Sequence, residues 1–298
     1  MAACVLLLAF PVLADGDAKS SKGKAKKEQE LFKFEAMKPG YRCVEKLVHR
    51  ATVVTAIGTR KDHVREQDTL TIKRTVERVA TKVDSESKPT EGQIVFKKLS
   101  GTDYDAYQRQ KYDVENVGKK VQIYAHTGYA NDHVRALVRP EWTTLTYGMT
   151  LPKFLEGKKL RLNRTIKIPN RHLGRSLGET VGNGEWDRVS LKPRKFVDVD
   201  GEACVKCQIT LKGYVGLKGG KVAAQGKSTL KGDLFLSRES GWPVKLELSG
   251  DMKLAFGVDG FGVGARGKNE IEIEWKHTQG NDEDEDEEDD EDDEDEDE

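Results

Sequence analysis

Strict alternation of apolar and polar residues is the feature that most constrains how this chain folds. Residues 270–276 (EIEIEWK) and 244–249 (VKLELS) alternate without a break, and 252–258 and 160–168 each keep their apolar residues on one face. A period of two sends successive side chains to opposite faces of a strand. Further segments of this kind are 41–55, 68–84, 93–99, 119–126, 133–138, 195–199, 203–213 and 229–237. We therefore predict an all-β fold of antiparallel sheets that form a barrel, half-barrel or sandwich.

The gaps between these segments carry turn residues, for example Asp200-Gly201. Helical periodicity is scarce, and we expect short helices only at 24–36, 151–158 and 171–178. Similar strand–turn–strand patterns near 79–101 and 195–213 suggest two similar β units, 38–148 and 149–278. Unrelated antiparallel hairpins also share this strand–turn–strand pattern, which explains the similarity equally well.

The net charge of −1 hides a polarised chain. Every residue from Asp282 to Glu298 is acidic, and this run opens with Asp282, Glu283, Asp284, Glu285 and Asp286. The 17 acids of the run leave 34 others against 50 Lys and Arg, so the rest of the chain is strongly basic. We expect a disordered acidic tail over 279–298, because neighbouring like charges repel and there is no apolar group to bury. It either solubilises and masks the basic body, or binds a cation or basic partner.

The N-terminus has the pattern of an export signal. An apolar run over 4–10 is followed by Val12-Leu13-Ala14, whose small residues suit cleavage after position 14. A basic start is missing, and a buried N-terminal strand is the competing interpretation. We predict a signal peptide over 1–14, a polar basic linker with a short helix over 15–37, and export to the periplasm, cell envelope or medium. No apolar run reaches the ~18 residues of a spanning helix.

Two catalytic motifs occur in the wrong context. The glycine pattern at 262–267 matches G-x-G-x-x-G but precedes a strand, whereas a dinucleotide site needs a helix there. Ser176 lies in a G-x-S-x-G pattern that runs into a glycine-rich stretch instead of a helix, so a serine hydrolase is a weak third hypothesis. His126 and His133 could face each other across a hairpin and hold a metal, but no H-E-x-x-H pattern or comparable acidic partner supports such a site, so we interpret them as a surface pair. We predict no catalytic, cofactor or metal site, and no enzyme.

Three cysteines follow the predicted signal peptide. Cys204 and Cys207 form a C-x-x-C at the start of a strand, where alternation places the two thiols on opposite faces. They should therefore not pair with each other. In an oxidising compartment Cys43 could form a disulfide with Cys207 or with Cys204. Three free or buried thiols are the competing outcome.

The basic surplus does not indicate nucleic-acid binding, because aromatic residues make up only 7% of the chain and no RNA-binding motif is present. For an exported protein, a lipid, an envelope polymer or a protein is a better partner. Lys38-Pro39-Gly40-Tyr41 before a long strand, residues 112–116 and residues 199–202 and 232–250 resemble exported bacterial β-rich proteins of an uncharacterised family. That resemblance implies structural turns and brings no catalytic residues.

The last hairpin is also similar, at fold level only, to the half-barrels of periplasmic lipoprotein carriers, whose concave sheet holds acyl chains. Our leading hypothesis is an exported, non-enzymatic envelope β protein that binds an apolar or anionic ligand, or a partner, in its concave sheet. The alternative is an interaction protein that acts through its acidic tail.

Overall fold

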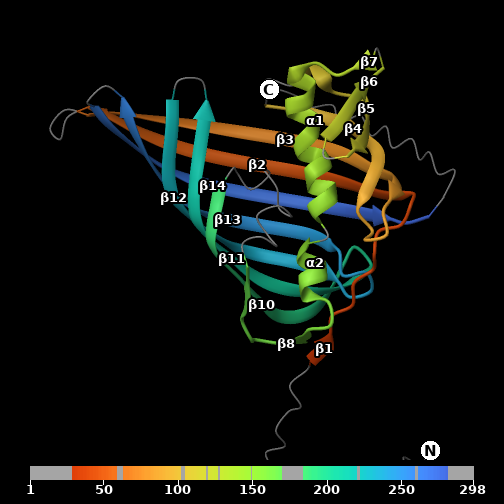
Figure 1. Ribbon diagram of the computed structural model, residues 1–298. Coiled ribbons are helices and arrows are strands. Elements are labelled where there is room, and N and C mark those ends of the chain that lie inside the picture. Colours follow the sequence, from red (N-terminus) through yellow and green to blue (C-terminus); the bar gives the residue numbers. More distant parts are fainter. Residues whose placement is uncertain are drawn as a thin grey trace, which may run out of the picture.

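The computed structural model describes residues 29–58, 63–101, 105–118, 120–126, 128–148, 150–169, 184–219, 222–258 and 261–280. Their secondary structure is mainly β (Figure 1). The strands are β1 (Gln29–Leu31), β2 (Tyr41–Gly58), β3 (His63–Val83), β4 (Pro89–Ser100), β5 (Lys111–Val117), β6 (Lys120–Ala125), β7 (Gly128–Tyr129), β8 (Lys159–Arg161), β9 (Ile166–Ile168), β10 (Gly184–Val199), β11 (Glu202–Gly219), β12 (Val222–Ser237), β13 (Pro243–Val258) and β14 (Phe261–Thr278). The helices are η1 (Asp105–Tyr107), α1 (Asp132–Gly148) and α2 (Thr150–Leu155).

Twelve of the strands form one antiparallel sheet in the order β7-β6-β5-β4-β3-β2-β14-β13-β12-β11-β10-β9. The sheet is strongly twisted and curled but does not close, and its long strands extend past the helices (Figure 1). The predicted all-β fold of antiparallel strands is therefore confirmed, and the open sheet agrees with the half-barrel or sandwich among the predicted forms rather than with a closed barrel. The pairing of β2 with β14, from Arg42 opposite Thr278 to Ala56 opposite Gly264, joins the two ends of the chain.

One face of the sheet packs against α1 and α2 and is called here the inner face; the opposite one is the outer face. Alternation decides which side chains are inner, as the buried Tyr41, Cys43 and Leu47 of β2 show. Two buried clusters fill this side. An N-terminal core packs α1 against β2–β6, and a C-terminal core packs α2 against β9–β14. Trp275 of β14 contacts both cores, so the two halves of the chain share one continuous interior.

Helix α1 corrects the strand predicted at 133–138. Val134, Ala136 and Val138 suggested alternation, but the buried side chains Val134, Val138, Trp142 and Leu145 recur at helical spacing. The Asn131 side chain caps the helix by accepting a hydrogen bond from the backbone N–H of Val134 at 2.9 Å. Pro140 inside the helix weakens the sequence signal for it.

The other predicted helices have mixed outcomes. Helix α2 confirms the one expected at 151–158. Residues 29–36 are not helical, since 29–31 form β1 against β8 and the backbone N–H of Phe32 bonds to the carbonyl of Lys158. The segment 171–178 and the predicted signal peptide lie outside the described residues. The division at 148/149 falls between α1 and α2 and stays a prediction.

Glycines allow the sheet to bend sharply. A Cβ on Gly232 of β12 would lie 1.7 Å from the backbone oxygen of Glu247, and one on Gly250 of β13 would lie 2.0 Å from that of Thr229. Such distances are far shorter than van der Waals contact, so any residue with a Cβ would clash with the neighbouring strand. Only glycine allows the two backbones to come this close. Glycine kinks of this kind curve an antiparallel sheet.

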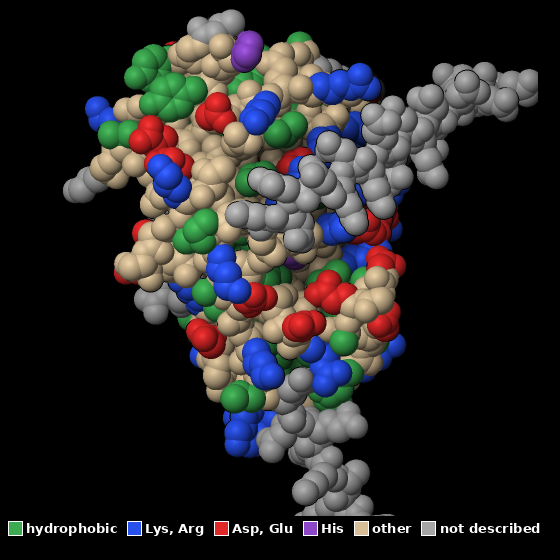
Figure 2. Space-filling view, turned by 90° about the vertical axis from the view of Figure 1, so that its right-hand side faces the viewer, with side chains coloured by type: hydrophobic (Ala, Val, Ile, Leu, Met, Phe, Trp, Pro, Cys, Tyr) green, Lys and Arg blue, Asp and Glu red, His purple; other side chains and the backbone are tan. Residues whose placement is uncertain are grey.

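The visible surface is mixed in charge. Lys and Arg side chains are interspersed with Asp and Glu over the face drawn in Figure 2, with no broad region of one sign. No helix in the described part of the chain is long and apolar enough to cross a membrane.

Candidate functional site

Three buried charged side chains and a fourth that is partly buried lie together between the sheet and α1. Arg78 of β3 contacts Glu45 of β2 at 3.1 Å and donates to Glu141 of α1, with its Nε 3.1 Å from Glu141 Oε2. Arg74 of β3 donates to Glu45 at 2.6 Å and also to Glu141. The side chains of Arg78 and Glu45 are each only 1% exposed. The two guanidinium and two carboxylate groups, called here the buried ion cluster, thus balance in charge.

The acidic and the basic side chains of this cluster are both held in their ionised forms. Burial alone would raise the pKa of Glu45, but the positive charges of Arg78 and Arg74 together outweigh it and lower that pKa to about 2. Burial alone would lower the pKa of Arg78, whereas Glu45 and Glu141 raise it well above its usual value. Trp275 of β14 adds a hydrogen bond from its indole N–H to Glu45 at 2.9 Å. The buried ion cluster therefore ties β2, β3, β14 and α1 together.

A partly buried histidine lies next to this cluster. Nε2 of His277 is 2.6 Å from the carbonyl oxygen of Pro243, which can only accept, so Nε2 carries the proton. Nδ1 then accepts the hydrogen bond of the Tyr41 hydroxyl at 2.6 Å. Burial lowers the pKa of His277 to about 4, and the positive charge of Arg78 adds to that effect. The imidazole is thus neutral near pH 7, with both nitrogens used.

A cavity of about 30 Å³ separates these groups from the C-terminal end of α1. It has room for one or two water molecules and no organic substrate. Trp242, stacked at 5.0 Å on Tyr41, lines it, and among the described residues its buried indole N–H has no hydrogen-bond partner. The thiol of Cys43 also lines the cavity, with its pKa raised to about 11 by burial. The Cys43 thiol is protonated and both nitrogens of His277 are used in hydrogen bonds, so neither group is ready to react. The arrangement is therefore suited to fixing α1 on the sheet.

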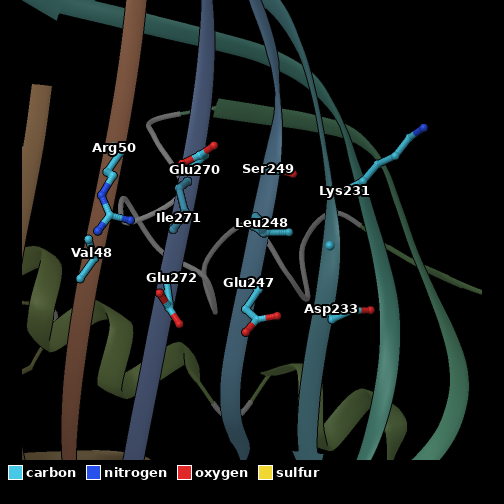
Figure 3. Close-up of a pocket in the computed structure, with 11 residues that line it drawn as sticks. Val48, Arg50, Lys231, Asp233, Glu247, Leu248, Ser249, Glu270, Ile271 and Glu272 are labelled. Atoms are coloured by element: carbon cyan, nitrogen blue, oxygen red, sulfur yellow. The ribbon is translucent and has the colours of Figure 1, made fainter. Parts of the chain in front are cut away.

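A larger hollow lies on the outer face. It is a shallow groove of about 350 Å³ across β2, β14, β13 and β12 (Figure 3). Two cross-strand rows line it: Arg50, Glu270, Ser249 and Lys231 in one, and Val48, Glu272, Glu247 and Asp233 in the next.

Most carboxylates of this groove already have cationic neighbours. Lys245 lies 3.0 Å from Glu272 and 3.2 Å from Glu247, and these hydrogen bonds raise its pKa well above the usual value. Lys206 pairs with Asp233 at 2.8 Å. Arg50 and Lys231 stand at opposite sides of the groove, three strand spacings or roughly 14 Å apart.

The three described cysteines are free, which agrees with the competing outcome of the sequence analysis and not with the candidate disulfide. Cys43, Cys204 and Cys207 are all buried and unpaired in the structure. Cys43 belongs to the N-terminal core and Cys207 to the C-terminal core, whereas Cys204 lies in an outer cluster with Phe235 and Val244. Between β2 and β11 there are four strand spacings, roughly 19 Å along the sheet. That span exceeds the ~7 Å Cα limit of a disulfide, and the alternation correctly separated Cys204 from Cys207.

The remaining predicted sites divide into two groups. The glycine pattern at 262–267 lies within β14, as its context indicated. Ser176 and the acidic run that begins with Asp282, Glu283, Asp284, Glu285 and Asp286 and ends with Glu298 lie outside the described residues. In the described part of the chain no group of three or more His, Cys, Asp or Glu side chains is arranged to hold a metal ion.

The sequence analysis missed the buried ion cluster. Glu45 shares the apolar face of β2 with Cys43 and Leu47, and Arg78 shares that of β3 with Val76 and Ala80. A charged residue in the middle of an apolar face is the signal that would have identified them, because charges are rarely buried unless paired.

Comparisons with known proteins give little more. No protein-family model matches the chain, and no curated protein matches it. A weak structural neighbour is the crystal structure of the COG4313 outer membrane channel from Pseudomonas putida F1. It has 11% sequence identity and a TM-score of 0.18, over 82% of this chain and 98% of that one. At that TM-score the likeness carries no argument, so the all-β architecture rests on the strand pairing of the chain itself.

Proposed function

We propose that this chain is an exported, non-enzymatic protein of the cell envelope that binds an anionic ligand in the outer groove of Figure 3. The observation that carries the proposal is the position of Arg50 and Lys231 at the two sides of that groove. Lys206 and Lys245 already offset three of the four carboxylates in the groove, and the fourth, Glu270, lies opposite Arg50 in the strand register. An incoming anion would bind Lys231 and compete with Glu270 for Arg50.

Several features support binding without catalysis. The inner face, where the sequence suggested a ligand, carries two packed cores in its described part. The described thiols are buried, and burial raises the pKa of Cys204 and Cys207 to about 12, so neither is a thiolate nucleophile near pH 7. Export itself rests on the apolar N-terminal run and the cleavage pattern that ends at Ala14.

Vesicle binding tests the ligand. Vesicles of phosphatidylglycerol should bind the protein more tightly than phosphatidylcholine vesicles, and added salt should weaken the binding. The double variant Arg50→Gln/Lys231→Gln should lose that preference. The matched control Lys46→Gln/Lys73→Gln removes two exposed charges from neighbouring positions outside the groove and should keep it. Equal binding by the two double variants would refute the site.

The proposed export has its own test. Mass spectrometry of the protein purified from cells would show whether cleavage leaves Asp15 at the N-terminus.

A second candidate function rests on where the last strand ends. The Gln279 side chain accepts a hydrogen bond from the backbone N–H of Lys38 at 2.8 Å, and Thr278 lies opposite Arg42. The last described residues before the acidic run thus lie beside the basic residues Lys38 and Arg42. If the run is the binding element, a chain ending at residue 281 should lose binding to a basic peptide such as polylysine while its melting temperature stays unchanged. Retained binding would exclude this function.

A further inference from the structure

A second shallow groove lies at the other end of the outer face, apart from the groove of Figure 3. It measures about 280 Å³ and crosses β3, β4, β5 and β6. A bulge in β3 between Ala80 and Lys82 bends the sheet at this point. The groove is lined by Thr81, Glu91, Gly92, Gln93, Asp113, Val114, Glu115 and Tyr124.

The polar lining residues stand in two parallel rows. Strand register places Gln93, Asp113 and Tyr124 in one cross-strand row and Glu91 and Glu115 in the next. Amide and carboxylate groups therefore face solvent side by side at strand spacing, about 4.8 Å apart. Such an array offers both donors and acceptors to a ligand that lies flat across the strands.

An aromatic platform continues the first row. Tyr129 of the edge strand β7 lies opposite Tyr124, with ring centroids 5.1 Å apart and an interplanar angle of 33°. Tyr129 is 69% exposed, so most of its ring has no packing partner within the fold. Apolar and aromatic side chains reach the surface near the top of Figure 2, the level at which Figure 1 places β5–β7. An exposed ring beside a polar groove is an apolar surface with hydrogen-bonding groups next to it.

The charge of the groove narrows the ligand class. Lys82 pairs with Glu91 at 2.8 Å, which leaves Asp113 and Glu115 as carboxylates beside the platform. The Tyr124 hydroxyl donates to Gln122 and lies 3.4 Å from Glu115, so these contacts involve the hydroxyl of Tyr124 and leave the exposed part of the Tyr129 ring open to a ligand. These carboxylates would repel an anionic ligand, whereas they would not repel a neutral ligand and would attract an amino-bearing one.

We propose that the outer face of β4–β7 is a binding site for a neutral or amino-bearing oligosaccharide. The C–H face of a sugar ring packs on Tyr129, and its hydroxyl groups bond to Gln93, Asp113 and Glu115. A groove of this volume accepts one or two sugar rings, which matches the width of the two rows. The site is separate from the anion groove and does not depend on it.

Titration calorimetry of the full chain tests the site with three defined trisaccharides: N-acetylglucosamine, glucosamine and galacturonic acid. The first two should bind and the acidic one should not. Tyr129→Ala should weaken binding about tenfold, because an aromatic contact and its buried area are lost. Leu70→Ala removes another exposed apolar side chain, 49% exposed on β3, and should leave binding unchanged.

Three results would overturn the proposal: no binding of either neutral or amino sugar at millimolar concentration, equal affinity in Tyr129→Ala, or displacement of the sugar by choline at similar concentration. The last would identify a simple cation site. Asp113→Asn supplies a second readout, since it should weaken glucosamine more than N-acetylglucosamine. Because Tyr129 and Asp113 are both at the surface, the melting temperatures of Tyr129→Ala and Asp113→Asn should stay within a few degrees of that of the parent chain.

Discussion

Protonation of His277 should dominate the loss of stability between neutral and mildly acidic pH. In the folded chain the ring is partly buried, its Nδ1 accepts a hydrogen bond from the Tyr41 hydroxyl, and desolvation lowers its pKa to about 4. In the unfolded chain the same ring titrates near 6.5. Between these values the unfolded state binds a proton that the folded state does not, so the free energy of unfolding falls as the pH falls. The difference between the folded and unfolded pKa values of His277 corresponds to a loss of about 3 kcal/mol in the free energy of unfolding over the whole pH interval.

Urea unfolding followed by tryptophan fluorescence at pH 7.5 and pH 5 measures this effect. The parent chain should lose about 2 kcal/mol over that interval, because pH 5 lies partway through it. Glu45 does not interfere, since its carboxyl titrates near 4.5 unfolded and at about 2 folded, so its stabilisation is lost only at lower pH. His277→Gln keeps an acceptor and a donor but cannot be protonated, and it should remove most of the loss.

His49→Gln is the matched control. Burial also lowers the pKa of His49, but this ring is less buried and accounts for a smaller part of the pH dependence. The control should therefore keep most of the loss seen in the parent chain. Equal pH dependence in the parent chain and in His277→Gln would refute the reasoning, because the neutral imidazole could then not be the source.

Three further outcomes follow from the packing. Glu141→Gln leaves buried guanidinium charge under-compensated and should destabilise the fold by about 3–5 kcal/mol in urea unfolding, whereas Glu91→Gln breaks an exposed pair and should change stability by less than ~1 kcal/mol. Gly232→Ala should lower the melting temperature sharply, because its Cβ has no room, while Gly148→Ala, with open space, should not. The described cysteines should react with a thiol reagent at pH 8 only after urea is added, and rapid reaction without urea would contradict their burial.

The sheet was predictable from the sequence because one of its faces is exposed to solvent and the other is buried, so polar and apolar residues alternate along each long strand. The same rule failed at 133–138, where a six-residue window fits both periods and only Trp142 and Leu145 further on reveal the helix. Strand order was not predictable, since pairing β2 with β14 depends on contacts more than 200 residues apart. The grooves were not predictable either, because they arise from bulges and register between strands, which a single strand's pattern does not contain.

The position of the buried ion cluster explains how one register is selected where the two ends of the chain meet. Glu45 accepts from Trp275 across the β2–β14 pairing and from Arg78 across the β2–β3 pairing. A slip of one residue in β2 would turn Glu45 to the outer face and leave Arg78 buried beside α1 with half of its carboxylate partners. The same slip would also turn Arg42, Lys46 and Arg50 to the inner face, together with Val44 and Val48, so the alternating pattern opposes it as well. The buried charges thus add the cost of an under-compensated guanidinium to the cost that the alternating pattern already imposes on the wrong pairing.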